Sequence, residues 1–333
     1  MRAILLDRPA PLTRTPLRLG EVPLPDPGPG EVRVRVTACG VCRTDLHVVT
    51  GDLAPKRSPL IPGHQVVGRV DALGPGAVRF ALGARVGIAW LRSTCGVCPD
   101  CRAGRENLCP RSRYTGWDDD GGYAEAAIVP EAFAYPLPAA FDDVEAAPLL
   151  CAGIIGFRAL ERAAVPAGGR VLLLGFGSSA HLVLQLARAR GHEVFVATRG
   201  ERHRSHARAL GADWVGDTFD PPPAPSDSAI VFAPAGEVVP AALRGVRKAG
   251  TVALAGVTLT PIPSMEYEPH LFHEKVLTSV ESNTRRDGEA LLAEAARAGI
   301  RPRTRTFPLE QAARALALLD EDGIEGTAVL VVS

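Results

Sequence analysis

Four cysteines lie close together in one short segment of the chain, and they constrain its fold more than any other feature. Cys95, Cys98 and Cys101 have the spacing of a metal-binding loop, and Cys109 follows eight residues later. Thiolates with this spacing form a tetrahedral cage for one zinc ion. We expect a lobe over residues 91–112 that is stabilised by a structural zinc, so the chemistry of the protein has to be sought elsewhere.

The length and charge of the chain indicate a globular protein of about two domains. It has 333 residues, no net formal charge and no Lys/Arg-rich tail, so nucleic acid and acidic membranes are not expected as partners. Its N-terminal apolar run is too short for a signal peptide, and no window approaches the roughly 18 apolar residues of a membrane span. The seven cysteines are odd in number and cluster at metal-like spacing. This pattern argues against a disulfide scaffold and favours a reducing, cytoplasmic location.

The first part of the chain is typical of a β-rich domain. Residues 32–36 alternate apolar and basic side chains, as a half-buried strand does. Residues 66–73 and 85–90 have similar patterns, and turns rich in proline and glycine separate these segments. We therefore expect a small, irregular antiparallel β domain here.

After about residue 142 the pattern changes to alternating strands and helices. Residues 142–162 have helical spacing, and short apolar strands then alternate with longer helical segments. This alternation predicts a doubly wound parallel sheet and an α/β fold class. The expected strands are 170–174, 193–197, 213–216, 228–232 and 250–255, and the expected helices are 179–190, 201–210 and 237–247. The tail should add helices at 287–298 and 309–319 and strands at 303–307 and 327–332.

The strand expected at 170–174 runs directly into a glycine-rich turn that a helix follows. This turn has the phosphate-binding pattern of a dinucleotide fold, with alanine in place of the third glycine. The glycines permit close approach of the backbone, and the N-terminus of the helix offers N–H donors to a pyrophosphate. A tight turn without a ligand is the alternative, but the strand–turn–helix context favours dinucleotide binding. The residues concerned are Gly175, Gly177, Ser178, Ser179 and Ala180.

The end of the next strand indicates which dinucleotide is bound. NAD enzymes place an acidic residue there to hold the ribose hydroxyl, whereas this chain has Thr198 and Arg199, with Arg202 close behind. Because the guanidinium group suits phosphate geometry, we predict NADP(H). The alternative is that these arginines form a solvated helix face and that the protein accepts both coenzymes.

The remaining three cysteines raise the question of a second metal site. Cys39 and Cys42, then His64, then Cys151 supply thiolate and imidazole groups at long separation. Two sulfurs and one nitrogen with an open fourth position describe a catalytic zinc site. Cys39 and Cys42 could alternatively form a redox pair, and His64 or Cys151 taken singly could be a core residue. The joint presence of these groups favours the metal site.

Six separated motifs are informative as a set. They are Cys42-Arg-Thr-Asp-Leu-His47, Gly63-His64, the four-cysteine lobe, Gly121-Gly-Tyr-Ala-Glu125, Leu149-Leu-Cys151-Ala-Gly153 and Gly175-Phe-Gly177. In this order and spacing they resemble the zinc-dependent medium-chain alcohol dehydrogenases, over essentially the whole chain. The resemblance implies a GroES-like catalytic domain, residues 1–149 and 284–333, with a Rossmann coenzyme domain, residues 150–283, inserted in it.

The resemblance also assigns the second metal site. It implies that Cys42, His64 and Cys151 hold the catalytic zinc. Asp45 would be the carboxylate that orients a ligand, as metal-bound histidines usually require. Cys39 would be a packed bystander.

A reaction follows from the same resemblance. Zinc would lower the pKa of a bound alcohol, which would then transfer hydride to nicotinamide, and in reverse it would polarise an aldehyde carbonyl. Thr44 and His47 would relay the proton through the coenzyme ribose to solvent, with His47 as the general base. Arg43 would contact the coenzyme pyrophosphate.

Three positions depart from the family pattern. Gln65 follows the ligand histidine where relatives usually carry glutamate, so ligand exchange at the metal is expected to differ. Thr327 stands where many relatives have a pyrophosphate-binding arginine. Leu53 stands where small-alcohol enzymes often have tryptophan, so with Trp90 as the opposite wall the substrate pocket should be wide and apolar. Trp117 could line this pocket or pack within the lobe.

We therefore expect an alcohol dehydrogenase that uses NADP(H) and acts on medium-sized or aromatic alcohols and their carbonyl compounds. Two zinc ions per chain are implied, and so is a homodimer or homotetramer joined through Rossmann sheet edges. The alternatives on this scaffold are a reductase of activated double bonds, which typically lacks the zinc ligands, and a polyol dehydrogenase, which generally relies on the missing glutamate. A non-catalytic coenzyme-binding protein would have no need of Thr44 and His47.

Overall fold

The computed structural model describes residues 1–332, and the chain divides into two compact units. The first unit comprises Met1–Cys151, Ser282–Arg297 and the segment that begins at Arg301. The second comprises Ala152–Glu281 and Ala298–Ile300. The first unit is therefore built from both ends of the chain, and the second from its middle.

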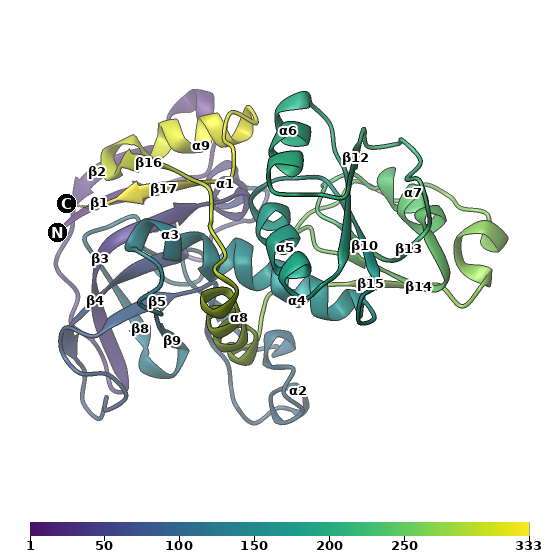
Figure 1. The fold of residues 1–333 in the computed structure, drawn as a ribbon. Helices are drawn as coiled ribbons and strands as arrows, with labels where there is room; N and C mark the ends of the chain where they lie inside the picture. Colours follow the sequence, from purple (N-terminus) through teal and green to yellow (C-terminus); the bar gives the residue numbers. More distant parts are fainter. Residues whose placement is uncertain (333) are drawn as a thin grey trace. The chain divides into compact units, whose positions relative to one another are not determined.

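A seven-stranded sheet is the centre of the first unit, in the order β16-β17-β3-β4-β5-β9, with β8 also paired to β3. The C-terminal strand β17 lies antiparallel beside β3, so the yellow end of the chain completes a sheet of purple and blue strands (Figure 1). The strands of this sheet are β3 (Glu31–Val41), β4 (Gln65–Leu73), β5 (Arg85–Ile88), β8 (Ala126–Pro130), β9 (Ala134–Pro136), β16 (Thr304–Pro308) and β17 (Thr327–Val331).

Shorter elements complete this unit. Two further strand pairs are β1 (Arg2–Leu6) with β2 (Leu17–Glu21) and β6 (Leu91–Ser93) with β7 (Arg113–Tyr114). The α-helices are α1 (Arg43–Thr50), α2 (Pro99–Arg102), α3 (Asp143–Pro148), α8 (Arg285–Ala298) and α9 (Ala312–Asp320). The 3-10 turns are η1 (Leu12–Arg14), η2 (Glu106–Leu108), η3 (Glu131–Phe133) and η6 (Leu309–Gln311).

Strand β3 is longer than the alternating pattern predicted. Val32, Val34 and Val36 are buried and alternate with less buried residues, as expected over 32–36. From Ala38 onward every residue of the strand is buried, so alternation stops where both faces are covered. This second half of β3 leads directly to Cys42.

The second unit contains a six-stranded parallel sheet in the order β12-β11-β10-β13-β14-β15. The predicted α/β fold, a β-rich domain together with a doubly wound parallel sheet, is confirmed. The strands are β10 (Arg170–Leu174), β11 (Glu193–Ala197), β12 (Trp214–Gly216), β13 (Ser226–Val231), β14 (Val246–Leu254) and β15 (Val276–Ser279), and the helices are α4 (Ile154–Ala163), α5 (Ser178–Ala189), α6 (Glu201–Ala209), α7 (Val238–Gly245) and the π-helical turn η5 (Glu268–Phe272).

Two local features differ from the sequence pattern. Strand β15 was not predicted, because it is a four-residue edge strand without fully buried positions. The helical spacing over 142–162 is interrupted by a π-helical turn, η4 (Leu149–Gly153), between α3 and α4. Pro148 ends α3, and because proline lacks an amide proton the regular hydrogen-bond ladder stops there. Among the described residues, no helix is long and apolar enough to cross a membrane.

Candidate active site and metal sites

Cys42 begins helix α1 and serves as its N-terminal cap. Its sulfur accepts a hydrogen bond from the Thr44 amide at 3.3 Å, and its own amide donates to Asp45 Oδ2 at 2.9 Å. This reciprocal capping box fixes the direction of the Cys42 side chain.

His64 is held by the same carboxylate. Its Nδ1 donates to Asp45 Oδ1 at 2.8 Å, and its Nε2 lies 3.3 Å from Cys42 Sγ. His64 is completely buried and Asp45 is 1% exposed. Burial opposes a charge on the imidazole, but the Asp45 carboxylate and the Cys42 sulfur raise the pKa of His64 well above its usual range. Asp45 thus holds the proton on Nδ1 and leaves Nε2 facing the sulfur.

Cys151 completes this group from the π-helical turn η4. Single π turns inside helices often occur at functional sites because they redirect a side chain. The ligand atoms of Cys42, His64 and Cys151 all lie within 4.8 Å of one another. Burial raises the pKa of the Cys42 thiol well above its usual range, so its thiolate form needs a cation beside it. Two sulfurs and one imidazole nitrogen are a donor set that suits zinc.

Gln65, which follows His64, is buried without a partner. Its carboxamide nitrogen and oxygen have no hydrogen-bond partner among the described residues, and the side chain is completely buried. Strand pairing sets Gln65 opposite Gly40, where a Cβ would fall 2.8 Å from the Gln65 carboxamide carbon. An uncharged polar group, next in the chain to His64 and without a hydrogen-bond partner among the described residues, is therefore packed against Gly40 of β3.

The two residues predicted to relay a proton lie on α1. Thr44 is buried, whereas His47 is partly exposed. His47 Nδ1 lies 3.0 Å from Asp52 Oδ2, and the Thr50 hydroxyl donates to the same oxygen at 3.0 Å. Asp52 was not singled out from the sequence, although its position five residues after His47, just beyond the helix, is a signal that could have found it. Arg43 is exposed at the first turn of α1.

An aromatic stack lies against His64. The Trp90 ring meets the imidazole edge-on with 4.9 Å between centroids, and it stacks on Tyr114 at 5.0 Å and on Trp117 at 5.9 Å. Trp117 therefore belongs to the same wall as Trp90. Leu53 is partly buried against the core of this unit, and its amide donates to the carbonyl oxygen of His47.

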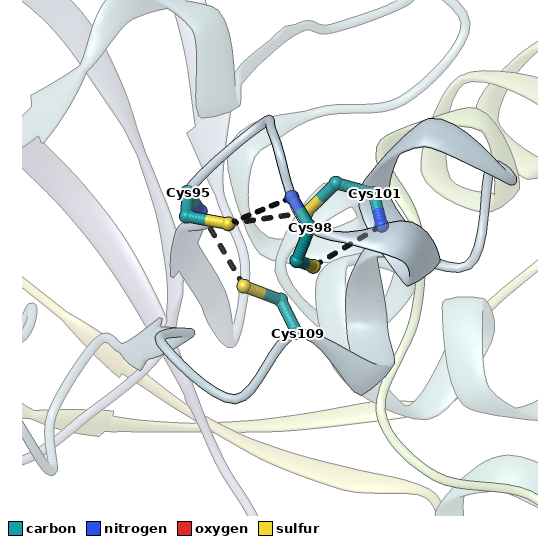
Figure 2. Close-up of side chains that lie close together, drawn as sticks. All are labelled: Cys95, Cys98, Cys101 and Cys109. Carbon is teal, nitrogen blue, oxygen red and sulfur yellow. Dashed lines mark hydrogen bonds between the residues drawn. The ribbon is translucent and has the colours of Figure 1, made fainter.

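The four cysteines of the lobe converge as Figure 2 shows, with their sulfurs within 4.8 Å of one another. Main-chain amides point at these sulfurs: Cys98 N lies 3.3 Å from Cys95 Sγ, and Cys101 N lies 3.4 Å from Cys98 Sγ. The amides of Val97 and Cys98, with the Arg111 guanidinium, lower the pKa of the Cys95 thiol to about 5. The thiolate form of Cys95 is thus favoured by its surroundings. Cys109 also accepts, from the amides of Cys95 and Arg111.

The glycine-rich turn of the second unit has the expected form. It joins β10 to α5, and Gly175 has a φ of +88°, a conformation that favours glycine. A Cβ on Gly177 would meet nothing within 4 Å, so its backbone is open to a ligand. No side chain caps the N-terminus of α5, which begins with Ser178, Ser179 and Ala180, and its first amides can therefore receive an anion.

The predicted 2′-phosphate residues lie at the end of β11 and the start of α6. Thr198 is buried, and Arg199 and Arg202 are exposed. Nearby Arg204 pairs with Asp217 at 2.7 Å and with Glu201 at 3.1 Å. The two acidic side chains near this turn, Asp217 and Glu201, are therefore both paired with Arg204.

Two family models match the chain. The alcohol dehydrogenase GroES-like domain matches residues 28–139, and the zinc-binding dehydrogenase domain matches residues 180–297. A probable alcohol dehydrogenase AdhA of Mycobacterium tuberculosis is 52% identical, over 100% of this chain and 97% of its own length. The chain belongs to the zinc-dependent medium-chain alcohol dehydrogenase family. It is an alcohol dehydrogenase, an oxidoreductase whose substrate is a small-molecule alcohol or aldehyde.

Solved structures of similar proteins have the same fold and differ in coenzyme. An NAD-dependent alcohol dehydrogenase aligns with a TM-score of 0.91 at 26% identity, covering 100% of both chains. A zinc-binding dehydrogenase of Sinorhizobium meliloti 1021 bound to NADP aligns with a TM-score of 0.85 at 28% identity, covering 99% of this chain and 98% of its own. The scaffold therefore serves either coenzyme, and the choice depends on this dehydrogenase's own side chains.

Proposed function

We propose that this alcohol dehydrogenase depends on zinc and carries two zinc ions per chain. Cys42, His64 and Cys151 would hold the catalytic ion, and the four cysteines of the lobe would hold the structural one. The observation that carries the proposal is the convergence of three donor atoms, within 4.8 Å of one another, from three distant segments. Three protein ligands leave a fourth position open, which is typical of a catalytic zinc site.

Zinc in this site would supply a Lewis acid that lowers the pKa of an alcohol hydroxyl and polarises a carbonyl oxygen. The protein's own side chains would hold the ligand histidine in place and move the proton. Asp45 keeps the Nδ1 proton of His64 in place, so that Nε2 is the nitrogen that would hold the zinc. Thr44 is the hydroxyl within the site, and the partly exposed His47 exchanges the proton with solvent, with its ring oriented by Asp52.

The coenzyme of this reaction is NADP(H) in our proposal. The open backbone at Gly177 and the amides of α5 would bind the pyrophosphate, with Arg43 as a cationic contact. Thr198 and Arg199, assisted by Arg202, would bind the 2′-phosphate, since a hydroxyl and a guanidinium attract the group that a carboxylate would repel.

The substrate in our proposal is a medium-sized or aromatic alcohol. The stacked rings of Trp90 and Trp117 form an apolar wall that begins at the ligand His64. Planar apolar substrates gain from offset or edge-on contacts with such rings. Leu53 leaves more room than a tryptophan at its position would.

A homo-oligomer also forms part of the proposal. Strand β15 ends the parallel sheet among the described residues, and Val276 on it is 48% exposed. Tyr267 and Phe272, which precede it, are 67% and 56% exposed. An unpaired edge with apolar side chains is a template for pairing with a second copy. The described cysteines form no disulfide, which suits the reducing cytoplasm that we propose as the location.

The test is a comparison of catalytic efficiency with NADP and NAD across ethanol, 1-hexanol and benzyl alcohol, before and after removal of metal with a chelator. We expect higher efficiency with NADP, a rise from ethanol to benzyl alcohol, and loss of turnover after chelation. A strong preference for NAD would overturn the roles of Thr198 and Arg199. Chelator-insensitive reduction of an activated double bond would instead support the reductase alternative.

A further inference from the structure

A third donor reaches the carboxylate that orients His64. Asp45 Oδ1 accepts from His64, whereas Oδ2 accepts from the Cys42 amide at 2.9 Å and from the Tyr123 hydroxyl at 3.1 Å. Asp45 and Tyr123 are 78 positions apart in the chain. The carboxylate therefore connects two metal ligands to a tyrosine that lies on a separate segment.

The Tyr123 ring is closely packed in its place beside Asp45. The residue is completely buried, and its backbone is fixed by hydrogen bonds from its amide to the Pro62 carbonyl and from the Ile4 amide to its own carbonyl. A Cβ on Gly63 would fall 2.3 Å from Tyr123 Cδ1. The Tyr123 ring thus occupies the space that a side chain at Gly63, the residue before His64, would need.

The hydroxyl of Tyr123 acts as a donor in this position. Burial, followed by the charge of Asp45, raises the pKa of Tyr123 well above its usual range. The phenol therefore keeps its proton and donates a hydrogen bond to Asp45 Oδ2. A buried carboxylate is stabilised by each such donor, and its orientation is fixed by the set of them.

We propose that Tyr123 is a positioning residue for the catalytic metal. Its hydroxyl fixes the rotation of the Asp45 carboxylate, and the carboxylate fixes the tautomer and the tilt of His64, so that Nε2 points at the ion. This inference rests on the proposed zinc site. Groups that support a metal ligand in this way typically change metal affinity by about 10- to 100-fold when they are removed.

Tyr123→Phe tests the hydroxyl and keeps the ring that fills the space at Gly63. Tyr135→Phe is the matched control, because Tyr135 is 1% exposed, lies in the same unit and has its hydroxyl beside Asn283 rather than the carboxylate that orients His64. Zinc release from the holoenzyme into a chromophoric chelator is followed for wild type and both variants. The cobalt(II)-substituted proteins are compared by visible absorption.

We expect one of two zinc ions to leave Tyr123→Phe about 10- to 100-fold faster, with the second ion unaffected. The cobalt bands of the catalytic site should shift in this variant only. Equal release from both tyrosine variants, or equal acceleration of both ions, would overturn the inference and leave the zinc site itself intact. A wild-type protein with a single zinc ion, held by the lobe, would overturn the proposed function and this inference together.

Discussion

In the lobe, four sulfurs come from one short loop and main-chain amides surround them, whereas the site of Cys42, His64 and Cys151 draws its ligands from three distant segments. The lobe cysteines are mostly half-exposed, and His64 is completely buried. The sulfurs of the lobe accept from the amides of their own loop. His64 is instead held by the side chain of Asp45.

The two sites therefore depend on different parts of the fold: one on a single loop, and the other on three separate segments. The proposed zinc of the lobe would be bound by the cysteines of a single loop whose amides face the sulfurs, so metal binding and local folding would be coupled there. The residues of the other site are placed by strand β4, helix α1 and the π turn η4, which belong to separate parts of the chain. Removal of the two ions should therefore have different consequences for stability and for activity.

The largest effect is expected from Cys151→Ser. The zinc content should fall from two ions to one, and alcohol oxidation should fall at least about a thousandfold, because a Lewis-acid metal supplies several kcal/mol of transition-state stabilisation. Metal analysis and steady-state kinetics check this result. Cys39→Ser is the control, because Cys39 is buried in β3 outside the ligand group, and this variant should keep both ions. Full activity in Cys151→Ser would break the comparison.

Cys101→Ser should produce the opposite pattern. Loss of the lobe ion should lower the free energy of unfolding by an amount on the order of several kcal/mol, because structural zinc contributes folding energy directly. The catalytic ion and turnover at low temperature should remain. Thermal unfolding and zinc analysis of the same sample measure both quantities. Loss of both ions together would show that the two sites are not independent.

Glu106→Gln tests how much an ion pair next to the lobe contributes to stability when all metal ligands are kept. Glu106 lies in η2 beside Cys109, is 8% exposed and forms a bidentate pair with Arg285 at 2.7 and 3.0 Å. Since Arg285 is partly exposed, we expect a loss of about 1–3 kcal/mol in the free energy of unfolding at pH 7. Urea unfolding measures this loss.

The pH dependence of that loss follows from the carboxyl group. Burial opposes ionisation, but the hydrogen bonds of Arg285 lower the pKa of Glu106 below its ordinary 4.5. Its contribution is therefore complete above pH 4.5 and disappears as the pH falls through the lowered value. The difference between wild type and Glu106→Gln should shrink below pH 4.5. Glu310→Gln, at a more exposed ion pair, is the control, and a constant difference would contradict this assignment.

The smallest effect is expected from His47→Gln. Turnover should slow by about tenfold, chiefly at lower pH, because general acid–base groups typically contribute at least that much. Both zinc ions should remain, since His47 is outside the ligand groups. A pH profile of kcat together with metal analysis decides the matter. An unchanged profile would remove His47 from the proton path.

Local features of the molecule were accessible from the sequence. Strands β10 and β11 coincide with the predicted ranges, since their apolar runs are short and bounded by turns. The lobe was predictable for the same reason, because its four ligands are adjacent in the chain. The glycines at 175 and 177 likewise predict the turn that joins β10 to α5.

Features that depend on distant partners were not accessible from local patterns, and the group of Cys42, His64 and Cys151 was expected only through the family resemblance. Tyr123 reaches Asp45 across 78 positions, and nothing local in Gly121-Gly122-Tyr123 says where its hydroxyl points. The π turn at Cys151 results from Pro148 and packing rather than from periodicity. Strand β15 has no alternating pattern of buried residues, and what defines it as a strand is its pairing with β14.

The most direct test of the account is a crystal structure with anomalous diffraction recorded at the zinc absorption edge. We predict two peaks in each chain: one among the four lobe sulfurs, and one at about 2.3 Å from Cys42 Sγ and Cys151 Sγ and about 2.0–2.1 Å from His64 Nε2. A single peak in the lobe, with none within bonding distance of His64, would contradict the proposed catalytic site.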